Sequence, residues 1–477
     1  MQSLAYPTLD KEVRPWPRSG VEACTWNGSI DRRRDAVPPR APSPILPGDG
    51  SGADARGCRV SGATSAALQA YEEAFDAFLD WRSGAETPLA RALQEAPRFV
   101  MAHVLQAWQL LCSRDPRRVR SARPVLARTA SLAANDRERL HLGAIASVLG
   151  DDYEGAKARL GALLRSHPRD ALALHAAHAL DYVTGDRARM KERVATVLPA
   201  WSRELPGYAA VLAMHAFGLE ECGDFQRAEQ VARSALGLHA SQARAHHVMA
   251  HVFEMTERAD SGVRWMNEHH AGWGGDTVVA THGWWHLALF HLSQGQWKEA
   301  LALYDGRVRA ARSDQVADLI DAASLLWRIE LHGGDAGARW TELAAAWEPH
   351  IDDGFCSFND LHAMLAFVGA RDGQRAQRLE RALQRQASLP TRHGMTTRQL
   401  GLPAGRALMA FARGQNALAI TVLASLPPLA HRLGGSHAQR DVLHLTLRQA
   451  LQRTRRRYDS KTMRSTSAAS WRSAISA

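Results

Sequence analysis

A short phrase that recurs at a fixed interval constrains the fold of this chain more than any other feature of its sequence. The phrase consists of a Gly or Asp, then an aromatic residue, then an alanine three positions after the aromatic one. Its three strongest copies end at Ala156, Ala228 and Ala300, which are 72 residues apart in each case. A fixed period of this kind predicts a tandem array of similar supersecondary units.

One weaker copy of the phrase falls near the midpoint of each of the two intervals, and further weaker copies follow Ala300. The first two lie 34 residues after the preceding alanine. That is the length of the tetratricopeptide repeat, a pair of helices joined by a short turn. Apolar residues recur at helical spacing, and a small residue where two helices cross lets them approach closely. The anchor positions of the weaker copies are Met190, Gly262, Arg339, Arg378 and Ala419.

The repeat predicts an all-α fold, a tandem tetratricopeptide-like solenoid of helix pairs wound as a right-handed superhelix over residues 61–451. An irregular helical bundle that shares Gly-containing turns is the alternative. We expect disordered tails on both sides. Residues 1–60 read as a Pro/Gly/Arg-rich leader and residues 452–477 as a basic flexible tail, unless the stretch 441–457 extends the last repeat as a polar capping helix.

Charge and composition narrow the classes of partner and compartment. The formal net charge is +10, but residues 452–477 hold seven basic residues against one acidic residue, so the body is nearly neutral and nucleic acid is an unlikely partner. No run of about eighteen apolar residues occurs, so we expect no membrane partner. The start of the chain lacks a signal-peptide pattern, and the five cysteines are scattered without a Cys-x-x-Cys pair. A cytoplasmic location is therefore expected.

The repeat register also predicts which side chains share a surface. In a tetratricopeptide solenoid the first helix of each pair lines the concave groove, through its second, fifth, ninth and twelfth places and their neighbours. Imidazole, carboxylate and guanidinium groups occupy these places in successive units. A solenoid core needs apolar contacts instead, so these polar groups favour a functional role. The predicted ligand-binding residues are His247, His251, Glu254, His282, His286, Asp321, Ser324, Arg328, Asp360, His362, Arg440 and Asp441.

Histidines one turn apart on a helix, such as His247 and His251, can bind a metal, act as general acid and base, or hydrogen-bond to each other. The metal interpretation is the weaker one, because the glutamate that follows the first histidine of a zincin helix is missing and no cysteine lies nearby in sequence. We expect no metal and no other cofactor. Helix-packing spacing predicts core positions for Trp265, Trp297 and Trp327. The position next to His286 favours the groove for Trp284 and Trp285.

Two functions fit these residues. The leading prediction is a binding module whose groove holds a peptide, a protein or a small polar ligand. The alternative is an enzyme of the hydrolase or lyase type, with His251, His286 and Asp360 as catalytic candidates in a closed pocket. The two differ in whether the groove is an open channel or an enclosed site.

Several local phrases resemble those of the tetratricopeptide repeat protein 38 family. The resemblance covers roughly Ser61 to Leu451 and implies the tandem helical-repeat fold, but it implies no activity, substrate or partner. The phrases that carry it are largely the groove residues predicted from the register. They include His247-Val-Met-Ala-His251, His282-Gly-Trp-Trp-His286, Phe358-Asn-Asp-Leu-His362, Gly401-Leu-Pro403 and Gly434-Gly-Ser436.

Overall fold

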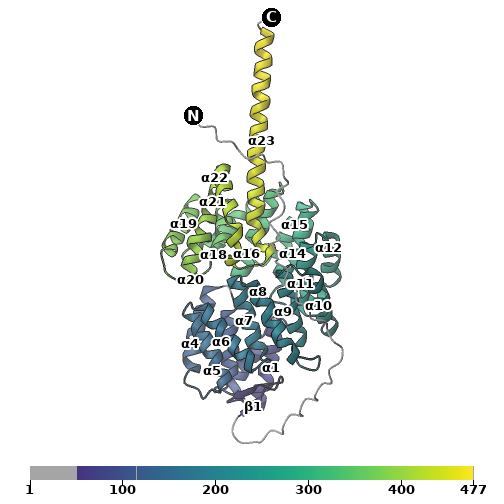
Figure 1. Ribbon diagram of the computed structural model, residues 1–477, viewed down its shortest axis with the longest axis vertical. Coiled ribbons are helices and arrows are strands. Elements are labelled where there is room, and N and C mark those ends of the chain that lie inside the picture. Colours follow the sequence, from purple (N-terminus) through teal and green to yellow (C-terminus); the bar gives the residue numbers. More distant parts are fainter. Residues whose placement is uncertain (1–50, 114, 476–477) are drawn as a thin grey trace.

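A computed structural model of the protein describes residues 51–113 and 115–475 (Figure 1). Within this part of the chain, 23 α-helices account for nearly all of the regular structure, and a single two-stranded hairpin is the remainder of it apart from short 3₁₀ and π turns. The prediction of an all-α fold is confirmed.

The hairpin lies in the segment that we expected to be a disordered leader. Strands β1 (Ser51–Ala53) and β2 (Arg59–Ser61) pair antiparallel. The Asp54 carboxylate accepts hydrogen bonds from the backbone N–H groups of Arg56 and Cys58, at 3.0 and 2.9 Å, and the buried Arg56 side chain pairs with Glu72 of the first helix. The segment 54–58 is therefore a turn nucleated by an aspartate. The prediction of disorder does not hold for residues 51–60, and residues 1–50 lie outside the described part of the chain.

The helices follow one another along the chain with short connections. The first group is α1 (Ser65–Leu79), α2 (Glu86–Glu95), α3 (Val100–Leu111), α4 (Pro116–Thr129), α5 (Asp136–Leu149), α6 (Tyr153–Ser166), α7 (Ala171–Thr184), α8 (Arg187–Val197), α9 (Tyr208–Glu221), α10 (Phe225–Leu238), α11 (Ala243–Met255) and α12 (Ala259–Glu268). The second group is α13 (His270–Trp273), α14 (Ala280–Ser293), α15 (Trp297–Leu303), α16 (Val316–Leu331), α17 (Arg339–Trp347), α18 (Ser357–Gly369), α19 (Gly373–Ala387), α20 (Arg392–Thr396), α21 (Leu402–Ala412), α22 (Asn416–Ser425) and α23 (His437–Ile475).

The recurring phrase proves to be the start of the second helix in each pair. Asp152, Asp186 and Asp224 are N-caps, and the side chain of each accepts a hydrogen bond from a backbone N–H in the first turn of α6, α8 and α10. The alanine of the phrase comes four positions after the cap and faces the preceding helix, and Ala156 and Ala228 are fully buried there. The phrase thus combines a helix stop, a helix start and a close helix crossing.

Helix pairs stack in chain order. The eight anchor positions fall on α6, α8, α10, α12, α15, α17, α19 and α22, and each of these helices packs against the helix before it and the first helix of the next pair. The first helices α9, α11, α14, α16 and α18 also contact one another in succession. They form a continuous row through the middle of the chain, and this row carries the predicted groove residues except Arg440 and Asp441, which lie on α23.

The apolar core lies between these helices. The largest buried side chains include Trp108 in the amino-terminal half and Trp285 and Trp347 in the second half. Of the three tryptophans assigned to packing, Trp327 is buried in the core, whereas Trp265 and Trp297 are half-buried and pack at its margin.

Helix α23 differs from the predicted basic tail. It begins at His437 and continues to Ile475, so no boundary between a folded body and a flexible tail occurs at residue 451. Good helix formers such as Leu, Gln, Arg, Ala and Met explain this continuity, since charge alone does not interrupt a helix. The end of α23 projects beyond the other helices (Figure 1). No helix in the described part of the chain combines the length and the apolar character needed to span a membrane.

Two segments far from the middle of the chain in sequence, the start of α23 and the loop after α1, pack against helices of the middle. The start of α23 contacts α11 and α16, and the 3₁₀ segment η5 (Pro427–Leu433) contacts α7. The approach is close, because a Cβ atom on Gly185 would lie 2.0 Å from the carbonyl oxygen of His431. At the other end, the loop after α1 pairs with the loop before α14, where the backbone N–H of Val278 donates to the carbonyl of Trp81 at 2.8 Å.

Candidate functional site

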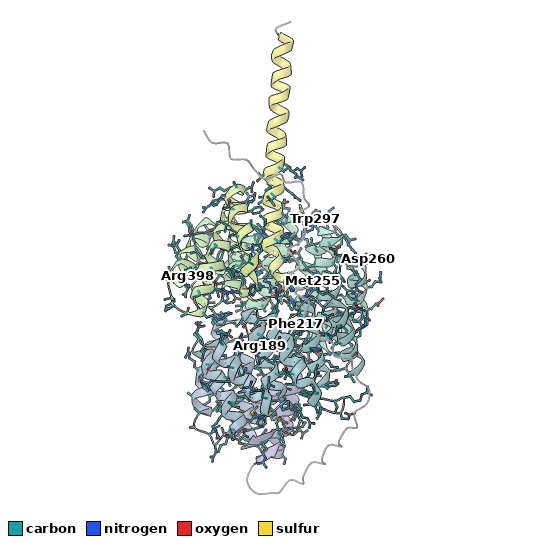
Figure 2. The ribbon with its side chains drawn as sticks, viewed as in Figure 1. Arg189, Phe217, Met255, Asp260, Trp297 and Arg398 are labelled. Atoms are coloured by element: carbon teal, nitrogen blue, oxygen red, sulfur yellow. The ribbon has the colours of Figure 1, made fainter. Side chains whose placement is uncertain are left out.

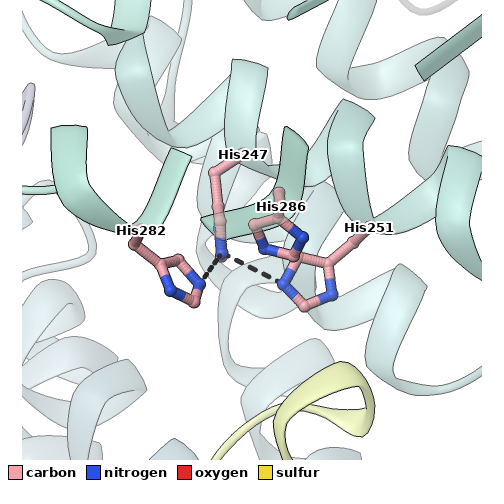
Figure 3. Close-up of side chains that lie close together, drawn as sticks. All are labelled: His247, His251, His282 and His286. Carbon is pink, nitrogen blue, oxygen red and sulfur yellow. Dashed lines mark hydrogen bonds between the residues drawn. The ribbon is translucent and has the colours of Figure 1, made fainter. Parts of the chain in front are cut away.

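The structure brings together four of the predicted histidines (Figure 3). Helix α11 supplies His247 and His251, and the adjacent helix α14 supplies His282 and His286. Each pair is one helical turn apart, so both rings of a pair project from the same face. The Nε2 atom of His247 lies 3.0 Å from Nε2 of His251 and 3.1 Å from Nε2 of His282. One ring nitrogen from each of the four histidines lies within 4.8 Å of the others.

Carboxylates stand behind three of these four rings. Asp321 on α16 lies 2.9 Å from Nδ1 of His282, and Glu254 on α11 lies 3.2 Å from Nδ1 of His286. Glu220 at the end of α9 faces Nδ1 of His251 at 3.7 Å, an ion-pair separation rather than a hydrogen bond. The outward nitrogens therefore face acceptors, and the inward nitrogens face one another.

The carboxylate of Asp321 fixes where the proton of His282 lies. An ionised carboxylate only accepts hydrogen bonds, so a neutral imidazole beside it carries its proton on Nδ1 and a lone pair on Nε2. The Nε2 atom of His282 consequently presents a lone pair to the centre of the cluster. The Nε2 atom of His286 is buried and has no hydrogen-bond partner among the described residues.

Burial controls the ionisation of the cluster. It lowers the pKa of His247, His251 and His286 well below the usual value, and the neighbouring imidazoles lower it further. Burial raises the pKa of Glu254 to about 7, and it raises the pKa of Glu220 well above the ordinary range. The imidazoles of His247, His251 and His286 are therefore neutral at neutral pH.

Aromatic side chains form the walls of the site. The Trp285 ring is fully buried and stacks on His282 with 5.0 Å between centroids. Phe217 of α9 lies edge-on to His251 at 5.6 Å, and Trp81 from the loop after α1 lies edge-on to His247 at 5.7 Å. Figure 2 shows Phe217 in the middle of the molecule. These walls keep bulk water away from the imidazoles, which strengthens electrostatic interactions inside the site.

The predicted residues Ser324 and Arg328 on α16 hold the start of α23 in place. The buried Arg328 guanidinium donates to the Ser324 side chain and to the backbone carbonyl of Ala438, and it lies 5.4 Å from the Trp285 ring. Burial lowers the pKa of Arg328, and the carboxylates of Asp441, Glu254 and Asp321 oppose this effect, Asp441 most strongly. These residues border the histidine cluster and connect it to α23.

The predicted residue Arg440 serves the same junction from the side of α23. Its guanidinium lies 3.4 Å from Glu221 at the end of α9, and it donates to the carbonyl of Gly435. Glu221 also accepts a hydrogen bond from the backbone N–H of His437 at 3.1 Å. The carboxylate of Glu221 is 1% exposed, so this ion pair is a buried link between α9 and α23.

Asp360 and His362 are not part of this cluster. Both lie on α18, where Nδ1 of His362 donates to the carbonyl of Phe358 at 2.8 Å. Burial, together with the nearby Asp353, raises the pKa of the Asp360 carboxyl to about 8. The group of ring nitrogens that lie within 4.8 Å of one another includes neither residue. Asp360 and His362 lie in the row of first helices, but on α18, two units after α14.

Sequence reasoning missed Glu220, Glu221, Phe217 and Trp81. Glu220 had a usable signal, because it lies eight residues before the anchor Ala228, just as Glu254 lies eight before Gly262. The same register puts Phe217 at the ninth place of α9. Trp81 lies in a loop outside the repeat and had no signal. No protein-family model matches the sequence, so the chemistry of the site itself carries the functional argument.

Proposed function

We propose that the protein is a cytoplasmic tetratricopeptide-type solenoid of the tetratricopeptide repeat protein 38 family, wound as a right-handed superhelix. The stacked helix pairs support this proposal, since all eight anchor positions fall on second helices. The local phrases of the family support it as well, because they contain the histidines of the cluster.

The function that we propose is binding of a small polar ligand at the histidine cluster, rather than of a peptide or protein. The observation that carries this proposal is enclosure. His251 and His286 are fully buried, and His247, His282 and Glu254 keep only limited exposure. The loop at Trp81 contacts His247, and the start of α23 packs against α11 and α16, so both add to the enclosure of the cluster. A small polar molecule needs only the limited exposure that remains.

Native mass spectrometry of gently purified, untagged protein tests this proposal. We expect a mass excess from a small organic molecule that is released on denaturation and is lost in His286→Gln. His246→Gln is the matched control, because His246 is also buried on α11 but bonds to the carbonyl of Ala240. If a displayed peptide library instead gives peptides whose binding requires His286, the site accepts extended chains and the proposal fails.

Catalysis of hydrolysis or elimination on the same ligand is the second candidate. The imidazole–carboxylate pair of His286 and Glu254, 3.2 Å apart, favours it, because such a pair is the usual arrangement of a general base and the group that orients it. Asp360 has no part in this version. The enzyme should release nitrophenol from simple nitrophenyl esters or phosphates, and His286→Gln should abolish the release; equal rates for the variant and the wild type would remove this candidate.

A further inference from the structure

The sequence argument against a metal considered one helix at a time. Helix α11 alone offers two nitrogen ligands, which is too few for a tetrahedral site. The fold supplies the other two from α14, where His282 and His286 repeat the same one-turn spacing. Two such pairs on neighbouring helices bring four imidazoles around one point. The group of four histidines includes no cysteine of the described residues.

The separations suit a metal ion of ordinary size. Four nitrogens at about 2.0–2.1 Å from a tetrahedral zinc ion lie about 3.3 Å from one another. The Nε2 separations of 3.0 and 3.1 Å around His247 fall close to that value, and one ring nitrogen from each of the four histidines lies within 4.8 Å of the others. An ion needs no larger cavity than these rings already enclose.

One inward nitrogen of the cluster lacks a partner. His282 donates its Nδ1 proton to Asp321, so its Nε2 lone pair points inward and faces Nε2 of His247. The buried Nε2 atom of His286 remains unsatisfied among the described residues. Converging lone pairs in a buried site are unfavourable unless a cation sits between them.

The carboxylates match the outer shell of a metal site. Metal-binding histidines in proteins usually donate their second ring nitrogen to a carboxylate, which fixes the tautomer and the orientation of the ring. Asp321, Glu254 and Glu220 hold these positions behind His282, His286 and His251, and they come from three different helices. Hydrogen bonding between structural histidines does not require this pattern.

We propose that His247, His251, His282 and His286 bind one divalent transition-metal ion through their Nε2 atoms. An all-imidazole ligand set selects zinc, or cobalt, nickel, copper or iron, over magnesium and calcium, which require oxygen ligands. This inference deepens the proposed function, since it names an ion at the same site. His247 has no carboxylate behind Nδ1, so it is the ligand held least firmly and the position that a small molecule would displace.

Metal analysis of the full-length, untagged chain tests the inference. The protein is stripped with a chelator, dialysed and titrated with Zn²⁺ alone, and in parallel with Co²⁺, whose visible absorption reports tetrahedral nitrogen ligands. We expect one equivalent of tightly bound metal and a rise in the thermal midpoint. In His251→Gln/His286→Gln the stoichiometry should fall to near zero, whereas His246→Gln should bind as the wild type does.

The wild-type titration decides the matter even if the double variant fails to fold. Absence of stoichiometric Zn²⁺ or Co²⁺ binding by folded wild-type protein would overturn the inference, and so would undiminished binding by a folded double variant. The two proposals fail separately. A bound metal without any organic molecule in the native mass spectrum removes the small-ligand function and keeps the metal, and the opposite result does the reverse.

Discussion

At the scale of single residues, the carboxylates behind the histidines decide what the cluster can do. Asp321 is the best placed of them, because its side chain is 5% exposed and its oxygens lie 2.9 and 3.0 Å from Nδ1 of His282. An asparagine at this position can still accept a hydrogen bond from the ring but carries no charge. A substitution of Asp321 by asparagine therefore separates the effect of the carboxylate charge from the effect of the hydrogen bond to His282.

Asp321→Asn should weaken metal binding by about 10- to 100-fold without abolishing it. Competition between the protein and a chromophoric chelator for Zn²⁺ measures the change. Asp318→Asn, one turn earlier on α16, is the matched control and should leave the affinity unchanged. An unaltered affinity in Asp321→Asn would mean that this carboxylate does not orient a metal ligand.

Asp360 predicts a pH dependence of stability. Its pKa is about 8 in the folded protein against 3.8 for the free side chain, because the carboxyl group is buried. Between these values the folded state holds a proton that the unfolded state has released, so stability falls as pH rises from about 4 to 8, by up to about 1.4 kcal/mol per pH unit from this group. Unfolding midpoints measured across that range should fall less steeply in Asp360→Asn, whereas the exposed Asp136→Asn should follow the wild type.

At the scale of helices, the small anchor residues set how closely the pairs pack. Gly262 of α12 lies against α14, and a Cβ atom there would come within 2.4 Å of the Phe290 ring. Gly237 of α10 is a helical glycine with open space around it. The two positions differ in what surrounds the missing side chain and not in secondary structure.

Gly262→Ala should destabilise the protein by about 1–3 kcal/mol, because the Phe290 ring must shift in a packed interface. Gly237→Ala should stabilise it by about 0.5–1 kcal/mol, because alanine is the better helix former. Urea unfolding of both variants measures these effects. Stabilisation by both substitutions would show that the crossing of α12 and α14 is looser than described.

The sequence predicted the helix pairs because their signals are local. An aspartate cap, a small residue and a proline or glycine stop lie within a few positions of one another and repeat every 34 to 41 residues. The same register placed the four histidines on neighbouring helices. It did not predict Trp81 or the contact of Arg440 with Glu221, since these depend on contacts between distant parts of the chain. The sequence also predicted a flexible tail where α23 continues, because a solvated helix and a flexible segment can have the same charged composition.

At the scale of the whole molecule, the link between α9 and α23 joins parts of the chain more than 200 residues apart. Glu221 pairs there with Arg440, and the hydroxyl of Tyr182, on α7, donates to Gln439 of α23 at 3.0 Å. Removing one partner from a buried ion pair leaves the other charge uncompensated, at a cost of about 3–5 kcal/mol. The effect should reach both sides of the contact.

Arg440→Ala should raise hydrogen exchange in α9 as well as in α23, because both helices lose the same contact. The exposed Arg448→Ala on α23 is the control and should change neither helix. Hydrogen-exchange mass spectrometry resolves the two segments. Faster exchange confined to α23 would show that the contact between α9 and α23 does not stabilise α9.

The contact of α23 with α7 and α9 also changes how the array of helix pairs folds and evolves. In an open array each unit depends on its neighbours alone, so a unit can be gained or lost, and folding spreads from any starting point. Here the pairing of Tyr182 with Gln439 makes distant segments neighbours, which raises the contact order and delays completion of the fold until most of the chain has been assembled. A helix pair inserted or deleted between α9 and α23 would carry these segments out of reach of each other. The contact of α23 with α7 and α9 therefore fixes the number of units between them.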